Sequence, residues 1–152
     1  VLDRLYKLLR TEGPTARLEK AVTLGIEQAR GKPQSHFGIP LRSLSPSSWG
    51  SASRLLKAVG SFTLPSDKLD ALVAVAHAIP ALYRAEHPED DSRQLGADDF
   101  LPIFIYVLVN SGVEGVASLS LNLDILCDPK KMIGEAGFCV ATLSAALQHL
   151  ER

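Results

Sequence analysis

The chain has 152 residues, of which 46% are hydrophobic and 22% charged, a composition typical of one globular domain with its own core. Its formal net charge of −1 argues against a nucleic-acid partner, because nucleic-acid binding needs a basic surface. No apolar run approaches the roughly 20 residues of a membrane helix, so we expect no membrane insertion. Because the chain does not begin with methionine, we expect it to be part of a larger multidomain protein.

The first sixty residues predict two helices and an irregular connector. Apolar residues in segment 1–10 recur at helical spacing, and Pro14 suits the first turn of a second helix that ends before Gly31. Residues 31–50 contain three prolines and many serines and glycines, which favour an irregular path over the surface. We expect this connector to pack through four hydrophobic residues, Phe37, Ile39, Leu41 and Trp49.

Two helices are predicted in the next part of the chain. Residues 51–60 form a short one that ends near Gly60, and a longer one follows with Ser66 or Asp67 as its N-cap. Pro80 lies inside the longer pattern and predicts a kink or a division into two helices, because proline cannot donate a helical hydrogen bond.

The stretch LGADDFLPIFIYVLV, residues 95–109, is ambiguous by propensity. Its β-branched and aromatic run, residues 103–109, is typical of a buried strand. The rest of the chain offers no convincing partner strand, and a single strand cannot satisfy its own backbone. We therefore predict a central helix here and a last helix from residue 134 onward. The expected fold is all-α, a single domain of about six to eight helices.

Asp98 and Asp99 stand at the start of this central helix. If the helix runs through Asp98, then Asp98, Pro102 and Ile105 share one face at i, i+4 and i+7. Pro102 leaves the Asp98 carbonyl without its helical donor, so the acid can project from the helix start. Asp99 lies about 100° round the helix and more naturally caps it or makes a structural hydrogen bond. Two interpretations stay open. Either both carboxylates are stabilised by the positive end of the helix, or one of them is presented to a binding partner.

The cysteines and histidines give no sign of a metal site. Cys127 and Cys139 lie in apolar stretches, as is typical of reduced, buried thiols in the cytosol. His36, His77, His87 and His149 lack the i, i+4 spacing of helical metal ligands. We therefore expect a cytoplasmic protein with no metal and no cofactor of its own.

Three phrases occur in the order and spacing of a known family. They are LPSDKLDALVAVAHAI at 64–79, LGADDFLPIFIYVLVNSG at 95–112 and GEAGFCVATLSAALQHLE at 134–151. Together they resemble the vacuolar-protein-sorting-nine (VPS-nine) domain, whose members are guanine nucleotide exchange factors for Rab GTPases of the Rab-five subfamily on early endosomes. The resemblance implies a layered, all-α fold within one structural domain. Its core is at residues 61–152, and residues 1–60 form upstream helices and a connector packed on that core.

The resemblance also implies a partner and a catalytic residue. The partner is a Rab-five-subfamily GTPase, GDP-bound or nucleotide-free, which brings nucleotide and Mg²⁺ with it. Asp98 corresponds to the acid that enters the phosphate site, where a carboxylate can pair with the GTPase lysine and exclude phosphate and metal. Pro102 and Ile105 are expected to contact the switch regions. The parent protein would reach endosomal membranes through its partner or its flanking domains.

The last helix departs from the family pattern. The family usually has a tyrosine directly after GE-x-G and a threonine three residues later, both facing the switch regions. Here these positions are Phe138 and Ala141, so both hydroxyls are missing. Phe138 keeps its ring, and it is expected with Ala141 to contact the switch regions. Thr142 is expected to offer a hydroxyl one residue later, although it points about 100° away on a helix. The alternative is a core aromatic at Phe138 and a packing residue at Ala141. Glu135 is expected to complement the helix dipole.

Two rivals therefore accompany the prediction of an exchange factor. The first is a Rab-binding or scaffold module of the same fold with weak or no exchange activity. The second is a helical scaffold or interaction domain with no GTPase partner, in which the acidic pair is only a helix cap.

Overall fold

The computed structural model describes residues 13–90, 94–126, 130 and 133–151. The helix predicted for residues 1–10 and Cys127 lie outside these ranges. The described residues contain six α-helices and three short 3-10 helices, with no strand among them, so the all-α prediction is confirmed. The α-helices are α2 (Gly13–Ala29), α3 (Gly50–Val59), α4 (Pro65–Glu86), α5 (Phe100–Ser111), α6 (Val116–Leu126) and α7 (Glu135–Leu150). The 3-10 helices are η1 (Gln34–Phe37), η2 (Leu41–Ser43) and η3 (Ala97–Asp99).

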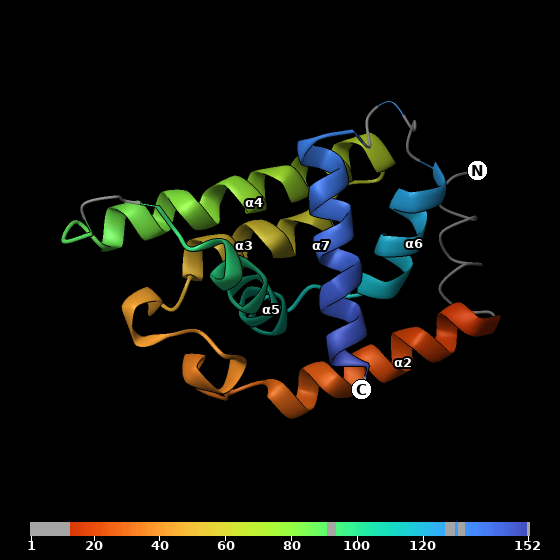
Figure 1. The fold of residues 1–152 in the computed structure, drawn as a ribbon. Coiled ribbons are helices and arrows are strands. Elements are labelled where there is room, and N and C mark those ends of the chain that lie inside the picture. Colours follow the sequence, from red (N-terminus) through yellow and green to blue (C-terminus); the bar gives the residue numbers. More distant parts are fainter. Residues whose placement is uncertain (1–12, 91–93, 127–129, 131–132, 152) are drawn as a thin grey trace.

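The strand-like run is the central helix α5. Every residue from Ile103 to Val109 is buried, because α5 is packed against α3, α4, α7 and η1. A helix that is apolar on all sides is stable only when it is surrounded in this way. Figure 1 shows α5 between the pair α3 and α4 and the helix α2, with α7 crossing in front. The prediction of a central helix rather than a strand is confirmed.

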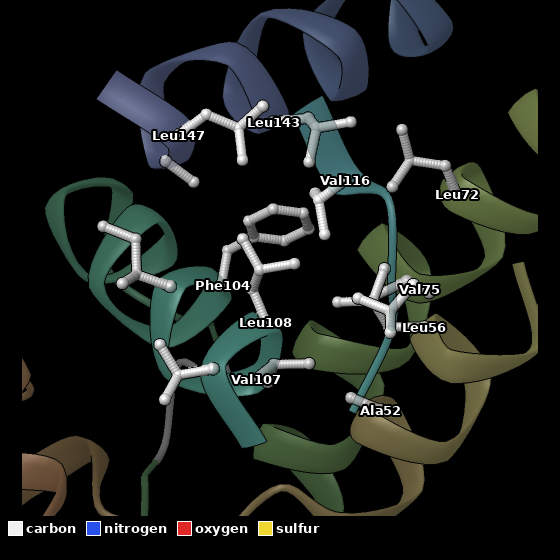
Figure 2. Packing of buried hydrophobic residues seen from close by; sticks show 14 of the residues in the cluster. Ala52, Leu56, Leu72, Val75, Phe104, Val107, Leu108, Val116, Leu143 and Leu147 are labelled. Atoms are coloured by element: carbon white, nitrogen blue, oxygen red, sulfur yellow. The ribbon is translucent and has the colours of Figure 1, made fainter. Parts of the chain in front are cut away.

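The core brings together side chains from most of these helices. In Figure 2, Phe104 and Leu108 of α5 point toward Leu143 of α7 and toward side chains of α3 and α4. Leu56 and Val75 on those two helices are fully buried. Burying a side chain of this size stabilises a fold by about 1.5–3 kcal/mol, so this cluster fixes α5 relative to α4 and α7.

Helix α4 is continuous, so of the two alternatives predicted at Pro80, a kink or a division, the division is wrong. Pro80 lies inside α4, which runs unbroken from Pro65 to Glu86. The helix also begins earlier than predicted, since its N-cap is Leu64 rather than Ser66 or Asp67. Pro65 occupies the first turn, where its fixed φ suits a helix and its missing N–H costs no bond.

The connector between α2 and α3 is more ordered than its composition suggests. Ile39 and Trp49 are 3% and 0% exposed, and the ring of Phe37 meets that of Tyr106 edge to face at 5.1 Å. The packing predicted for these three residues is confirmed, whereas that of Leu41 is wrong because Leu41 is 86% exposed. Leu41 begins η2, and this short helix turns the neighbouring Ser43 inward instead.

Helices α2 and α7 come close together at Gly25. A Cβ atom at Gly25 would lie only 1.9 Å from the carbonyl oxygen of Leu150, so only glycine permits this crossing. None of the helices within the described ranges is both long and apolar enough to cross a membrane.

Candidate functional site

The two acids lie in a 3-10 turn in front of α5. Asp98 and Asp99 belong to η3, and α5 begins at Phe100, so the assumption that the helix runs through Asp98 is wrong. Pro102 is the third residue of α5. At this position the backbone N–H has no partner inside the helix, so Pro102 removes no helical bond and is not needed to loosen the turn.

The structure separates the two acids by burial. Asp98 is exposed, whereas Asp99 is 5% exposed. The Asp99 Oδ2 atom accepts a hydrogen bond from Ser43 Oγ at 2.9 Å and one from Arg42 Nη2 at 3.4 Å. No side-chain capping bond is made at the start of α5. The prediction that Asp99 makes a structural hydrogen bond is confirmed, and Asp98 is left on the surface.

The first turns of α7 add apolar surface near η3. Phe138 is 56% exposed, and its ring lies 5.6 Å from that of Phe100. Ala141, one turn further along α7, is also exposed, and Leu101 is 36% exposed. Phe138 is therefore not a core aromatic. Its ring rests on Phe100 and keeps much of its surface open to solvent.

The remaining predicted contact residues are less accessible. Ile105 is 5% exposed and Thr142 is 8% exposed, and Pro102 is half-buried. The Thr142 hydroxyl donates to the Phe138 carbonyl at 2.8 Å, so it is engaged by its own helix. The structure therefore brings Asp98, Phe138 and Ala141 to the surface and places Ile105 and Thr142 beneath it.

A groove lies beside this surface, between α4 and the segment that leads into α5, with Phe138 of α7 at its side. It has a volume of about 390 Å³ and a mostly apolar lining with one arginine and one glutamine, formed by Pro80, Arg84, Gln94, Leu95, Gly96, Phe100 and Phe138. Two of these residues, Gly96 and Phe100, flank η3 in the chain. The groove and the exposed acid are thus parts of one region of the molecule.

Two contacts link α4 to neighbouring segments beside this region. His77 Nε2 lies 2.8 Å from Glu135 Oε1, with both side chains more than half exposed. Glu135 therefore pairs with α4 as well as standing in the first turn of α7. At the end of α4 the Tyr83 hydroxyl donates to Asp90 at 2.7 Å. This hydrogen bond, followed by burial, raises the pKa of Tyr83 to about 12.

Sequence patterns do not predict several contributors to this region. Ser43 and Arg42 bind Asp99 from 56 and 57 positions away, and no local pattern signals such a contact. Phe100 and Leu101 directly follow the acids, so their closeness in the chain is a usable signal. Among the described residues no group of three or more histidines, cysteines or acids could hold a metal ion.

The side chains around η3 are suited to noncovalent binding rather than to covalent catalysis. An exposed carboxylate on an anchored turn can accept charge-assisted hydrogen bonds from an ammonium group or from backbone amides. The neighbouring apolar side chains can bury a partner's hydrophobic surface. This combination is chemically suited to contact with another protein, with one acid at the edge of the apolar surface.

Comparison with known proteins identifies the family. Residues 49–152 match the model of the Vacuolar sorting protein 9 (VPS9) domain, so the chain belongs to the VPS9 domain family. The matched range contains η3, α5 and α7, and therefore the whole surface that carries Asp98 and Phe138.

Three relatives illustrate the similarity. The chain is 28% identical to human VPS9 domain-containing protein 1, over 88% of the chain and 24% of the relative. It is 26% identical to human Ras and Rab interactor 1, over 95% of the chain and 17% of the relative. Identity to Vacuolar protein sorting-associated protein 9A of Arabidopsis thaliana is 27%, over 66% of the chain and 19% of the relative. The chain thus spans less than a quarter of the length of each of these relatives.

Proposed function

We propose that this domain is a guanine nucleotide exchange factor for a small GTPase of the Rab-five subfamily. The observation that carries the proposal is the division of the acidic pair, with Asp99 buried and Asp98 exposed on the same turn. Membership of the VPS9 domain family supports it, as does the similarity to a protein named for interaction with Ras and Rab.

An exchange factor accelerates GDP release when it binds the nucleotide-free GTPase more tightly than the nucleotide-bound one. Asp98 supplies this difference. Its carboxylate enters the phosphate site, pairs with the lysine that otherwise binds phosphate, repels the phosphate and crowds out Mg²⁺. No covalent bond is made or broken in the domain.

The exposed apolar residues hold the GTPase while the acid enters. Phe138, Leu101 and Ala141 are all exposed, and their side chains suit the hydrophobic switch regions of a GTPase. Pro102 and Ile105 support this surface from the first turns of α5. In the cell the parent protein acts in the cytoplasm in endosomal trafficking and is recruited to endosomal membranes through its partner or flanking domains.

A second candidate is a Rab-binding module of the same fold with weak or no exchange activity. It is favoured by Phe138 and Ala141, which are exposed and carry no polar side-chain atom. Each hydroxyl missing from such a surface removes a hydrogen bond worth about 0.5–1.5 kcal/mol. The two candidates differ in rate of release and not in the ability to bind.

Release of fluorescent GDP from a panel of Rab GTPases tests the proposal. We expect the domain to accelerate release from a Rab-five-subfamily member, and Asp98→Ala to lower the accelerated rate by about 10²-fold. The matched control is Asp124→Ala, which removes an exposed acid from α6, a helix away from η3 (Figure 1). Both variants should keep the wild-type unfolding midpoint, because both carboxylates are exposed.

Other outcomes separate the candidates. Retention of nucleotide-free Rab without faster release would favour the binding module, and failure to retain any Rab would favour an interaction domain without a GTPase partner. Full activity in Asp98→Ala would show that another residue displaces the nucleotide.

A further inference from the structure

We infer that Ser43 and Arg42 of the connector are positioning residues for Asp98, acting through the buried carboxylate of Asp99. The functional half of this inference rests on the proposed exchange activity, whereas its structural half concerns the turn η3 alone. The connector would then hold η3 in place and fix the orientation of the Asp98 side chain.

The contact itself is buried and made at one oxygen atom. Ser43 is 1% exposed and Asp99 is 5% exposed. Ser43 Oγ donates to Asp99 Oδ2 at 2.9 Å, and Arg42 Nη2 approaches the same atom at 3.4 Å. A buried carboxylate that loses its donors carries a large desolvation cost. The turn is therefore held strongly to the connector at this point.

Asp99 could have served its own helix instead. It occupies the N-cap position of α5, where an aspartate ordinarily accepts a hydrogen bond from the first turn. Its side chain makes no such bond and reaches across to Ser43. The start of α5 therefore lacks a side-chain cap, and the Asp99 carboxylate instead makes a tertiary hydrogen bond next to Asp98.

The connector segment that carries Ser43 is itself held in place by other hydrogen bonds. Gln34 Oε1 accepts hydrogen bonds from the Ser45 backbone at 3.0 Å and from the Trp49 indole at 3.1 Å. Trp49 is fully buried, and the Ser45 hydroxyl donates to Glu86 at the end of α4. Ser43 lies between Gln34 and Ser45 in the chain, so it cannot simply follow a movement of η3.

The turn is also tightly closed around the Asp99 side chain. The Asp99 N–H donates to the Gly96 carbonyl at 3.0 Å, and a Cβ at position 96 would lie 3.2 Å from Asp99 Oδ2. The backbone at Asp98 is thus restrained by two hydrogen bonds, one from the Asp99 N–H to Gly96 and one from Ser43 to the Asp99 carboxylate. An acid held in this way is preorganised, so less freedom is lost when it enters a partner's site.

Exchange kinetics test the functional half. We expect Ser43→Ala to lower the maximal GDP-release rate about tenfold, because a small displacement of a reacting group costs this much or more. The concentration of domain at half-maximal rate should stay within about twofold, since the apolar surface is unchanged. Arg42→Ala should have a smaller effect, because the Arg42 side chain is 72% exposed and exposed ion pairs contribute little.

The matched control is Ser111→Ala at the opposite end of α5. Ser111 is also a buried serine, and its hydroxyl donates to the Leu108 carbonyl at 2.8 Å. This variant should lower the unfolding midpoint without changing the exchange rate. Ser43→Ala should lower the unfolding midpoint both alone and in the Asp98→Ala background, but it should change the GDP-release rate only when Asp98 is present.

Hydrogen–deuterium exchange of the isolated domain tests the structural half without any GTPase. Ser43→Ala should speed exchange in the peptide that covers residues 96–101 by about tenfold, and Ser111→Ala should not. Equal rates in the two variants would overturn the inference. So would a full GDP-release rate in Ser43→Ala. If the wild-type domain accelerates release from no GTPase, the proposed function fails, and the deuterium comparison still decides whether Ser43 fixes η3.

Discussion

The ring of Phe138 on α7 lies 5.6 Å from the ring of Phe100 on α5, at an interplanar angle of 49°. Tilted aromatic pairs of this kind contribute about 0.5–1.5 kcal/mol beyond their buried area. Phe100 in turn stacks on Phe104 in the core at 6.2 Å. The exposed ring of Phe138 is therefore supported from the core outward and is presented beside η3 in a fixed orientation.

This support makes Phe138 a sensitive position for exchange. We expect Phe138→Ala to lower the GDP-release rate about tenfold, because the partner loses a large, preorganised apolar contact. Phe138→Tyr should match or exceed the wild-type rate, since an added hydroxyl can contribute a hydrogen bond worth about 0.5–1.5 kcal/mol. The measurement is GDP release across a range of domain concentrations.

Phe62→Ala is the control for this pair of variants. Phe62 is 42% exposed and lies between α3 and α4, away from η3 in the chain. It should leave the release rate unchanged. A wild-type rate in Phe138→Ala would show that the ring takes no part in binding.

The sequence predicts the central helix of this fold even though its local propensity is ambiguous. The apolar run 103–109 has no plausible partner strand, and this is enough to identify α5 as a buried helix. Different roles can also be assigned to Asp98 and Asp99 from the sequence, because neighbouring residues on a turn point in different directions. The assignment of Asp99 to the fold is confirmed by its contact with Ser43.

The errors arise where distant parts of the chain decide the local structure. Leu41 is apolar yet 86% exposed, because η2 turns Ser43 toward Asp99 instead. Pro80 does not divide α4, since the packing of α4 against α3, α5 and α7 outweighs one missing helical bond. The 3-10 turn η3 likewise makes a contact across 56 positions, which no local pattern contains.

Cys139 is predicted to be unreactive in the folded domain. It is 3% exposed, and burial, together with the Glu135 carboxylate, raises the pKa of its thiol from 9.0 to about 11. The nucleophilic thiolate is therefore scarce at pH 8. In a Cys127→Ser variant, iodoacetamide should label Cys139 slowly in buffer and rapidly in urea. Equal labelling rates in the two solvents would contradict the buried position of the thiol.

The same pKa fixes how Cys139 affects stability with pH. Because the folded-state pKa lies above the unfolded one, the contribution is fully present below pH 9.0 and is lost as the pH rises toward about 11. Cys139→Ala should therefore unfold with less pH dependence than wild type across this window. Urea titrations at several pH values provide the measurement.

Glu19 on α2 caps the start of α6 from almost a hundred residues away. Its Oε2 atom accepts hydrogen bonds from the Ser118 N–H at 3.0 Å and from the Ser118 hydroxyl at 3.2 Å. Its Oε1 atom accepts one from the Ala117 N–H at 3.4 Å. These two N–H groups belong to the first turn of α6, where no partner exists within the helix.

Glu19→Gln should therefore destabilise the domain by about 1–2 kcal/mol, because it removes a charge that favours the helix start and one of two acceptor oxygens. Urea unfolding measures the change. Glu27→Gln is the matched control, since Glu27 is an exposed acid on the same helix and should unfold like the wild type. Neither variant should alter the GDP-release rate once corrected for folded fraction, because α6 begins away from η3 (Figure 1). Equal midpoints for the two variants would mean that α6 does not depend on α2 for its cap, and that water satisfies its first N–H groups equally well.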